Sequence, residues 1–344
     1  MTSLRTAVLA TTPVVVGLLS GSCSTLSRQP DRASCVPLNA APTPATFPDR
    51  AARAAFVDLD GRYRWRRVLR KARIDTLVIQ HLVGRSAQDT FYNHEEALAL
   101  VREAPGGTTI FVGLIYDSAF DPLHATAEEL QAAAVEDVQT ATEFWGQIPE
   151  SDRSRIGGWY LAREISNVAV DSAQARAVGG YLTHVARHLP SRPRVLISPY
   201  FVPPSQTRPE LLGPAATAEL LTSLTRDSGV TDVLLQDGVG ARNMHPQGCR
   251  WVLETFLPIS AEYARAVEEG LPPVITFWSN VEAFGPRATP NRLQRQLALV
   301  PPERRVIVFA YRDCVRTRVC TRVKRPAGAG ASRRSVRAGQ ERRN

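Results

Sequence analysis

The sequence predicts an α/β fold, a single (β/α)8 TIM barrel, with an N-terminal signal and linker before it and a disordered basic tail after it. Between about residues 54 and 312, eight short apolar runs alternate with longer amphipathic stretches, over the length expected for one such barrel. The runs are almost continuously hydrophobic, which is typical of strands buried on both faces of a parallel sheet. No GxGxxG turn follows the first run, which argues against an open dinucleotide-binding sheet.

The elements follow from these runs and from the helical patterns between them. The expected strands cover 55–57, 76–79, 109–115, 156–161, 194–198, 232–236, 274–278 and 305–310. The expected helices cover about 63–73, 93–103, 125–147, 172–188, 208–227, 246–269 and 290–299. Helix-starting residues open the third helix at 125–130, and the pair Gly106-Gly107 ends the second.

The first 23 residues have the pattern of a bacterial signal peptide. Arg5 is followed by an apolar run over 7–19 and then by three small residues before Cys23. The run is too short and too interrupted to span a bilayer as a stable helix. Its end resembles the lipobox of bacterial lipoproteins, in which Cys23 would carry the lipid, and an ordinary cleaved signal is the alternative. We therefore expect an exported protein that is lipid-anchored in the cell envelope or secreted.

The remaining segments have distinct compositions. Residues 24–53 are rich in Pro, Ser, Ala and Arg and are expected to be a linker, so that the barrel domain spans 54–320. Residues 321–344 are expected to be a disordered basic tail. From Lys324 onward the tail carries a net charge of +6, which leaves only +3 of the total +9 for the rest of the chain. The folded body is thus not strongly basic, and we expect no specific nucleic-acid partner.

Besides Cys23 the chain contains four cysteines, which are Cys35, Cys249, Cys314 and Cys320. An even number in an exported protein suggests disulfides. Cys314 and Cys320 are close enough in sequence to pair, with Cys35 then joining Cys249, but the sequence does not choose among the three possible pairings. No Cys/His spacing suggests zinc, so no metal and no cofactor are expected.

Polar and aromatic residues follow the expected strands, at the end where (β/α)8 barrels hold their active sites. Sugars are bound by this combination, because aromatic rings stack on the sugar ring while acids and amides bond its hydroxyls. The candidate substrate-binding residues are Asp58, Gln80, His81, Tyr116, Asp117, Trp159, Tyr200, Gln236, Trp278 and Asn280.

Three carboxylates at this rim are candidates for catalysis. Hydrolysis of a glycosidic bond requires two carboxyl groups, and we assign Glu164 after the fourth strand as the general acid/base and Glu282 after the seventh as the nucleophile. Asp237 after the sixth strand would orient the substrate or tune the pKa of the acid. Each has a structural alternative: Arg163 could pair with Glu164, Asp237 could cap an Asp-Gly turn, and Glu282 could lie on a loop beyond the strand.

Several blocks together resemble the bacterial domain of unknown function 4434 over roughly 54–312. They are Phe56-Val57-Asp58 with Ile74 to Gln80, Gly158-Trp159-Tyr160-Leu161 with Glu164, Leu235 to Gly240, and Phe277 to Phe284. That family is grouped by similarity with TIM-barrel glycoside hydrolases and has no settled activity. The resemblance implies that Glu164 and Glu282 sit where retaining barrel glycosidases keep their acid/base and nucleophile, although Arg163 stands where many of those enzymes have Asn.

We therefore predict a monomeric, exported glycoside hydrolase that acts on a cell-surface or environmental polysaccharide. A non-catalytic carbohydrate-binding lipoprotein is the main alternative. A third hypothesis is a cell-envelope scaffold whose basic tail contacts an anionic polymer.

Overall fold

The computed structural model describes residues 54–57, 59, 65, 74–191, 194–242, 252–283 and 290–309. The chain divides into two units, Met1–Arg32 and Ala33–Asn344, and all described residues belong to the second. The predictions about the signal peptide, linker, tail and first helix fall outside the described residues, apart from Trp65. The same is true of those about Asp58 and the cysteines Cys23, Cys35, Cys249, Cys314 and Cys320.

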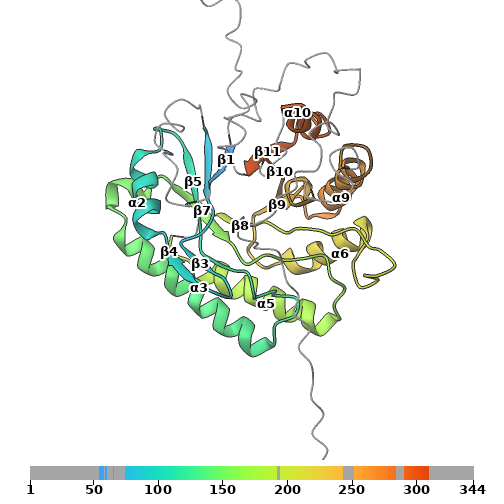
Figure 1. Ribbon diagram of the computed structural model, residues 1–344. Helices are drawn as coiled ribbons and strands as arrows, with labels where there is room; N and C mark the ends of the chain where they lie inside the picture. The colour runs from blue at the N-terminus through green and yellow to red at the C-terminus, as the bar shows by residue number, and fades with distance from the viewer. Residues whose placement is uncertain are drawn as a thin grey trace, which may run out of the picture. The chain divides into compact units, whose positions relative to one another are not determined.

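Eight parallel strands close into a barrel, which confirms the predicted fold (Figure 1). In barrel order by sequence they are β1 (Ala54–Val57), β2 (Thr76–Ile79), β5 (Thr109–Gly113), β7 (Ile156–Leu161), β8 (Arg194–Ile197), β9 (Asp232–Gln236), β10 (Thr276–Glu282) and β11 (Arg305–Phe309). The first and last strands pair through Ala55 and Val308, which closes the sheet. A closed parallel sheet has no free edge, and its two faces are covered by side chains inside the barrel and by helices outside it.

The helices form an arc outside the strands (Figure 1). They are α2 (His94–Glu103), α3 (Ala127–Gln147), α4 (Glu150–Arg153), α5 (Ser172–His188), α6 (Pro214–Thr225), α7 (Val239–Arg242), a π-helix (Val252–Phe256), α9 (Leu257–Gly270) and α10 (Pro290–Ala298). Thr126 and Glu129 form a capping box at the start of α3. No helix within the described ranges is long and apolar enough to cross a membrane.

One predicted helix begins at the wrong residue, and proline is the physical reason. The helix expected from 208 begins at Pro214, where the ring fixes φ and needs no hydrogen bond from its nitrogen. The helix expected over 246–269 is π-helical over Val252–Phe256 and becomes α-helical at Leu257, immediately before Pro258.

Side chains along each strand alternate between two apolar clusters. One cluster fills the barrel and includes Phe56, Phe111, Tyr160, Leu234 and Trp278. The other lies between the barrel and the helices. Residues near the carboxyl end of a strand therefore point either toward the barrel mouth or into the helix layer, according to their position in this alternation.

The strand β10 is longer than predicted, because it continues past Trp278 to Glu282. Beyond Trp278 its inward positions are polar and only the helix-facing Val281 is apolar, so hydrophobicity alone ends the strand too early. Glu282 is consequently the last residue of a strand and does not lie on a loop.

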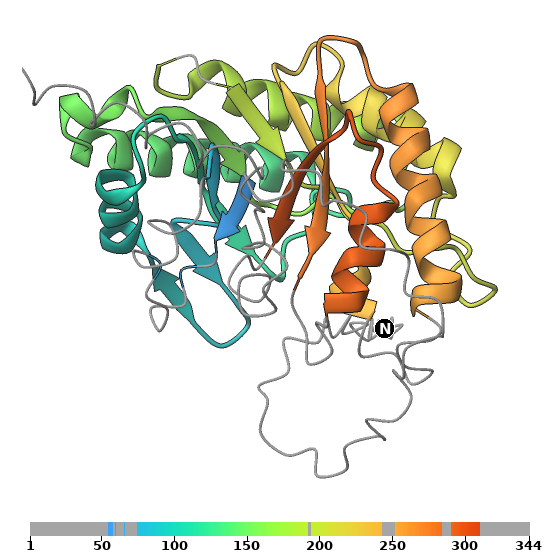
Figure 2. The same ribbon diagram turned by 90° about the horizontal axis from the view of Figure 1, so that it is seen from above.

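A second, three-stranded sheet was not predicted. It is formed by β3 (Val83–Arg85), β4 (Thr90–Tyr92) and β6 (Ile115–Asp117) in the order β4-β3-β6. The apolar run 109–115 was predicted as one strand, but the barrel strand ends at Gly113 and the second sheet begins at Ile115. Because β3 follows β2 and β6 follows β5, this sheet continues the barrel wall beyond two neighbouring strands. Its hairpin lies next to α2 (Figure 2).

The break between β5 and β6 depends on Gly113. A Cβ atom at this position would lie 1.9 Å from the carbonyl oxygen of Gln80, which is a backbone atom and cannot easily move aside. We expect Gly113→Ala to lower the free energy of unfolding by about 2–4 kcal/mol in urea denaturation.

Gly180 in α5 provides the matched control, because a Cβ there would meet no atom of the described residues within 4 Å. Gly180→Ala should raise the free energy of unfolding by about 0.5–1 kcal/mol. Equal stability of the Gly113→Ala variant and the wild type would contradict the close approach between the strands.

Candidate active site

Glu164 lies just past the end of β7 and is partly exposed. Its Oε1 accepts a hydrogen bond of 3.1 Å from Nε2 of Gln236, the last residue of β9. Burial raises the pKa of Glu164 above its usual value, although the Gln236 hydrogen bond opposes this, and the negative charge of Asp121 raises it further. The carboxyl group is therefore protonated over a wider pH range than an exposed glutamate.

Three tyrosines lie close enough to this carboxyl group for its negative charge to raise their pKa values. Burial raises the pKa of Tyr116 and Tyr200 to about 12 and that of Tyr160 well above its usual value, and the charge of Glu164 adds to each shift. All three phenols are consequently neutral near pH 7 and able to donate hydrogen bonds. Tyr116 and Tyr200 are partly exposed, whereas Tyr160 is buried in the barrel.

Arg163 points the other way and does not neutralise Glu164. Its guanidinium bonds Glu136 Oε2 at 2.9 Å and Asp137 Oδ2 at 3.2 Å, both on α3. The Tyr181 hydroxyl donates to the same Asp137 oxygen at 2.7 Å. Alternation explains the split, since adjacent residues at a strand end face opposite sides of the sheet.

Polar groups connect the ends of four neighbouring strands. Gln236 donates to the backbone oxygen of Ser198, and Asn280 on β10 donates to the Ser198 hydroxyl at 3.2 Å. The Asn280 oxygen Oδ1 is buried and has no hydrogen-bond partner among the described residues. This network runs from Glu164 past β7 to β10, where Glu282 lies two residues beyond Asn280 on the same inward side and is 3% exposed.

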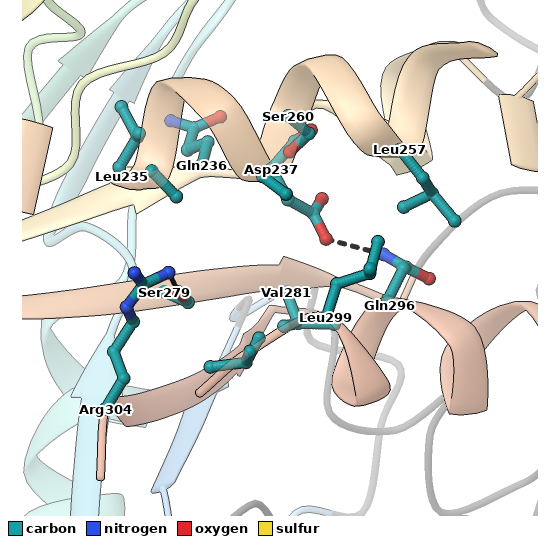
Figure 3. Close-up of a pocket in the computed structure, with 13 residues that line it drawn as sticks. Leu235, Gln236, Asp237, Leu257, Ser260, Ser279, Val281, Gln296, Leu299 and Arg304 are labelled. Atoms are coloured by element: carbon teal, nitrogen blue, oxygen red, sulfur yellow. Dashed lines mark hydrogen bonds between the residues drawn. The ribbon is translucent and has the colours of Figure 1, made fainter. Parts of the chain in front are cut away.

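Asp237 does not face the mouth, which corrects its assignment to catalysis. Its carboxylate accepts hydrogen bonds from the backbone nitrogens of Val239 at 3.1 Å and Glu282 at 3.2 Å, and from Gln296 Nε2 at 2.6 Å. Figure 3 shows it in a small pocket formed by β9, β10, α9 and α10 on the helix side of the sheet. Asp237 therefore caps the turn at Gly238, whose φ is +66°, and holds the backbone of Glu282.

Neither predicted tryptophan platform is accessible. Trp159 is fully buried on the helix side of β7, against Phe144 and Trp145 of α3. Trp278 lies inside the barrel and donates from Nε1 to Asp232, the first residue of β9, at 2.8 Å. It is thus near the amino ends of the strands, away from the mouth, and neither indole can stack on a sugar.

The other predicted binding residues have mixed positions. Gln80 is half-buried directly after β2. The Asp117 carboxylate accepts from the backbone nitrogen of Ala119 at 3.0 Å, so it stabilises a turn. His81 is buried between Phe91 and Tyr116, and burial lowers its pKa to about 4, which keeps the ring neutral.

Two residues near Glu164 were missed from sequence. Tyr160 precedes Glu164 by four positions and therefore shares its face, so counting back from the predicted acid in steps of two residues reaches Tyr160 and not Trp159. Asp121 lies in the loop after β6, where its Oδ2 accepts from the Ser166 hydroxyl at 3.2 Å. No sequence signal marks it. Within the described ranges no three His, Cys, Asp or Glu side chains are grouped to hold a metal ion.

The fold and site define a TIM-barrel protein with a partly buried acid at the carboxyl end of its fourth strand. The sequence matches the domain of unknown function DUF4434 over residues 62–318, and the chain belongs to this family. A search of curated proteins gives no match.

Two solved structures show distant similarity. The spore cortex-lytic enzyme SleL of Bacillus cereus has 12% identity and a TM-score of 0.37, with 66% of this chain and 50% of that chain covered. This chain thus spans half the length of that enzyme. A 2,3-dimethylmalate lyase of the PEP mutase/isocitrate lyase superfamily has 15% identity and a TM-score of 0.39, with 86% and 92% covered. At these values neither protein informs the activity of this chain.

The Asp237 carboxyl group should make stability depend on pH. Burial raises its pKa in the folded protein to about 6 from 3.8, so the folded state holds the proton more tightly. The free energy of unfolding should therefore fall as pH rises from about 4 through 6, by roughly 1–3 kcal/mol from this group.

Asp237→Asn removes this charge while keeping the shape of the side chain. We expect the variant to match the wild type near pH 4 and to be more stable at pH 7, as measured by urea denaturation across that range. Parallel pH profiles for the two proteins would contradict the assignment.

Proposed function

We propose that this protein is a glycoside hydrolase in which Glu164 is the general acid/base. The observation that supports this most directly is the environment of Glu164 at the end of β7. It is held by Gln236, surrounded by three neutral tyrosines, and has a pKa raised by burial. A general acid must be protonated at the working pH, and burial of a carboxyl group is one way in which enzymes achieve this.

The reaction requires a second carboxylate, for which we propose Glu282. In the first step Glu164 donates its proton to the glycosidic oxygen, and the bond from that oxygen to the anomeric carbon breaks. Depending on the gap between the two carboxyl groups, Glu282 follows one of two routes. It attacks the anomeric carbon to form a covalent intermediate, which water then hydrolyses with Glu164 accepting the water proton. Alternatively, it accepts the proton of a water molecule that attacks the anomeric carbon directly. The substrate hydroxyls would be bonded by the partly exposed Tyr116 and Tyr200 phenols.

The substrate we propose is a polysaccharide of the cell surface or the environment. This follows from the expected export of the chain and from the aromatic and amide groups near Glu164. Attachment to the membrane through a lipid on Cys23 is part of the same proposal.

A non-catalytic carbohydrate-binding protein is the second candidate. It is favoured by the burial of Glu282, which is only 3% exposed and would have to become accessible to reach an anomeric carbon. Saturable glycan binding without any product would support this alternative.

Replacement of either proposed catalytic residue tests the assignment. We expect Glu164→Gln and Glu282→Gln each to lower kcat on a cleaved polysaccharide by about 10²–10⁴-fold, as measured by release of reducing sugar. Glu143→Gln on the outer surface of α3 is the control and should keep the wild-type rate. Wild-type rates in both active-site variants would refute the assignment.

Glu164→Gln should also stabilise the folded protein. The folded-state pKa of Glu164 is raised, so loss of its proton destabilises the fold as pH rises, and the amide removes that cost while still accepting the Gln236 hydrogen bond. We expect the thermal midpoint at pH 7 to rise by roughly 2 °C, measured by circular dichroism. An unchanged or lower midpoint would show that burial of this carboxyl group carries no stability cost.

A further inference from the structure

Three residues form one row across the small sheet of β4, β3 and β6. Gly84 on β3 is directly opposite Phe91 on β4 and directly opposite Tyr116 on β6. Side chains in one row of a sheet point to the same face. The row therefore has an aromatic ring at each end and a glycine, which leaves space, between them.

The space above Gly84 is occupied by aromatic rings. A Cβ atom at Gly84 would lie 2.1 Å from the Phe91 ring and 2.9 Å from Nε2 of His81. The His81 ring lies 5.3 Å from that of Phe91, edge to face, and is stacked at 5.7 Å on that of Tyr116. Glycine at this position thus allows Phe91, His81 and Tyr116 to form a continuous strip.

The strip faces the barrel mouth and not the helix layer. On the opposite face of the small sheet, Val83 and Ile115 belong to the helix-side core, and Arg85 bonds Glu136 of α3. Tyr116, in contrast, packs against the cluster inside the barrel and lies within the electrostatic reach of Glu164. The strip is therefore continuous with the candidate active site at one end.

At its other end the strip is open to solvent. Phe91 is 42% exposed, although an apolar ring gains free energy when it is covered. Beneath it, both ring nitrogens of His81 are buried and have no hydrogen-bond partner in the described part of the chain. An exposed aromatic ring backed by further aromatic rings suits a ligand with C–H faces that can stack on it.

We propose that Phe91, His81 and Tyr116 form a carbohydrate-binding platform that extends the active site, with Phe91 as the outer residue on which a sugar ring stacks. This inference rests on the proposed function and names a subsite for it. A chain bound with one sugar at Glu164 would continue over Tyr116 toward Phe91. The platform would then favour substrates of several sugar units over disaccharides.

Tyr92 provides a matched control for Phe91. It is the next residue of β4, is more exposed at 69%, and points to the opposite face of the sheet, opposite Val83. Phe91→Ala and Tyr92→Ala therefore remove similar aromatic surface from the same strand, but only the first removes it from the platform. Phe91→Tyr keeps the ring and tests whether an aromatic face is sufficient.

The experiment measures binding and turnover separately. Cellohexaose, chitohexaose and laminarihexaose, with the corresponding disaccharides, are titrated by calorimetry into the wild type, the three variants and Glu164→Gln. Release of reducing sugar is measured with the same oligosaccharides and enzymes. We expect Phe91→Ala to weaken binding of the preferred hexasaccharide about tenfold and of its disaccharide less than about twofold. Tyr92→Ala and Phe91→Tyr should bind as the wild type does.

The outcomes distinguish the subsite from the catalytic proposal. If Phe91→Ala weakens binding and the wild type shows no turnover, the result supports the platform and refutes hydrolysis of these sugars. If the wild type shows turnover and Phe91→Ala binds the hexasaccharide as tightly as the wild type does, the result overturns the platform and supports hydrolysis. Equal losses in Phe91→Ala and Tyr92→Ala, or no binding of any hexasaccharide by the wild type, would also overturn it.

Discussion

Closure of the parallel sheet is the constraint on which the rest of this structure depends. Once β1 pairs with β11, every strand has one face inside the barrel and one face against helices. The residue that follows a given inward side chain must then face outward. Glu164 therefore faces the mouth and Arg163 faces the helix layer. In the same way, Gln236 faces the mouth and Asp237 faces the helices.

The same constraint explains why the pKa of Glu164 is raised. The interior beneath the mouth is apolar, with Tyr160, Leu196 and Leu234 packed together, so the carboxyl group is partly removed from water. Gln236, Ser198 and Asn280 form the polar layer above that core, and the hydrogen bond that Gln236 donates to Glu164 comes from a neutral amide. Arg163 is held by Glu136 and Asp137 on the far side of the wall, where its charge is already matched.

The strands could be predicted from sequence because burial on both faces produces short apolar runs, and most of the barrel strands follow such runs closely. The main exception, β10, ends in alternating polar and apolar residues, since its last inward side chains belong to the mouth. The break at Gly113 could not be predicted, because it depends on a contact with the Gln80 carbonyl of another strand. The alternation of inward and outward side chains along each strand would have predicted that Tyr160 and Gln236 face inward while Trp159 and Asp237 face the helices. The composition near the strand ends could not make this distinction.

Glu136 on α3 binds two arginines that lie on the helix side of the barrel wall. One is Arg85 on β3, whose sheet carries Phe91 and Tyr116, and the other is Arg163, the residue before Glu164. A single carboxylate on the outside of the barrel thus links the small sheet to the residue that precedes the proposed acid. Under the proposed function, a substitution in α3 would be expected to alter chain-length selectivity while every residue of the mouth stays the same.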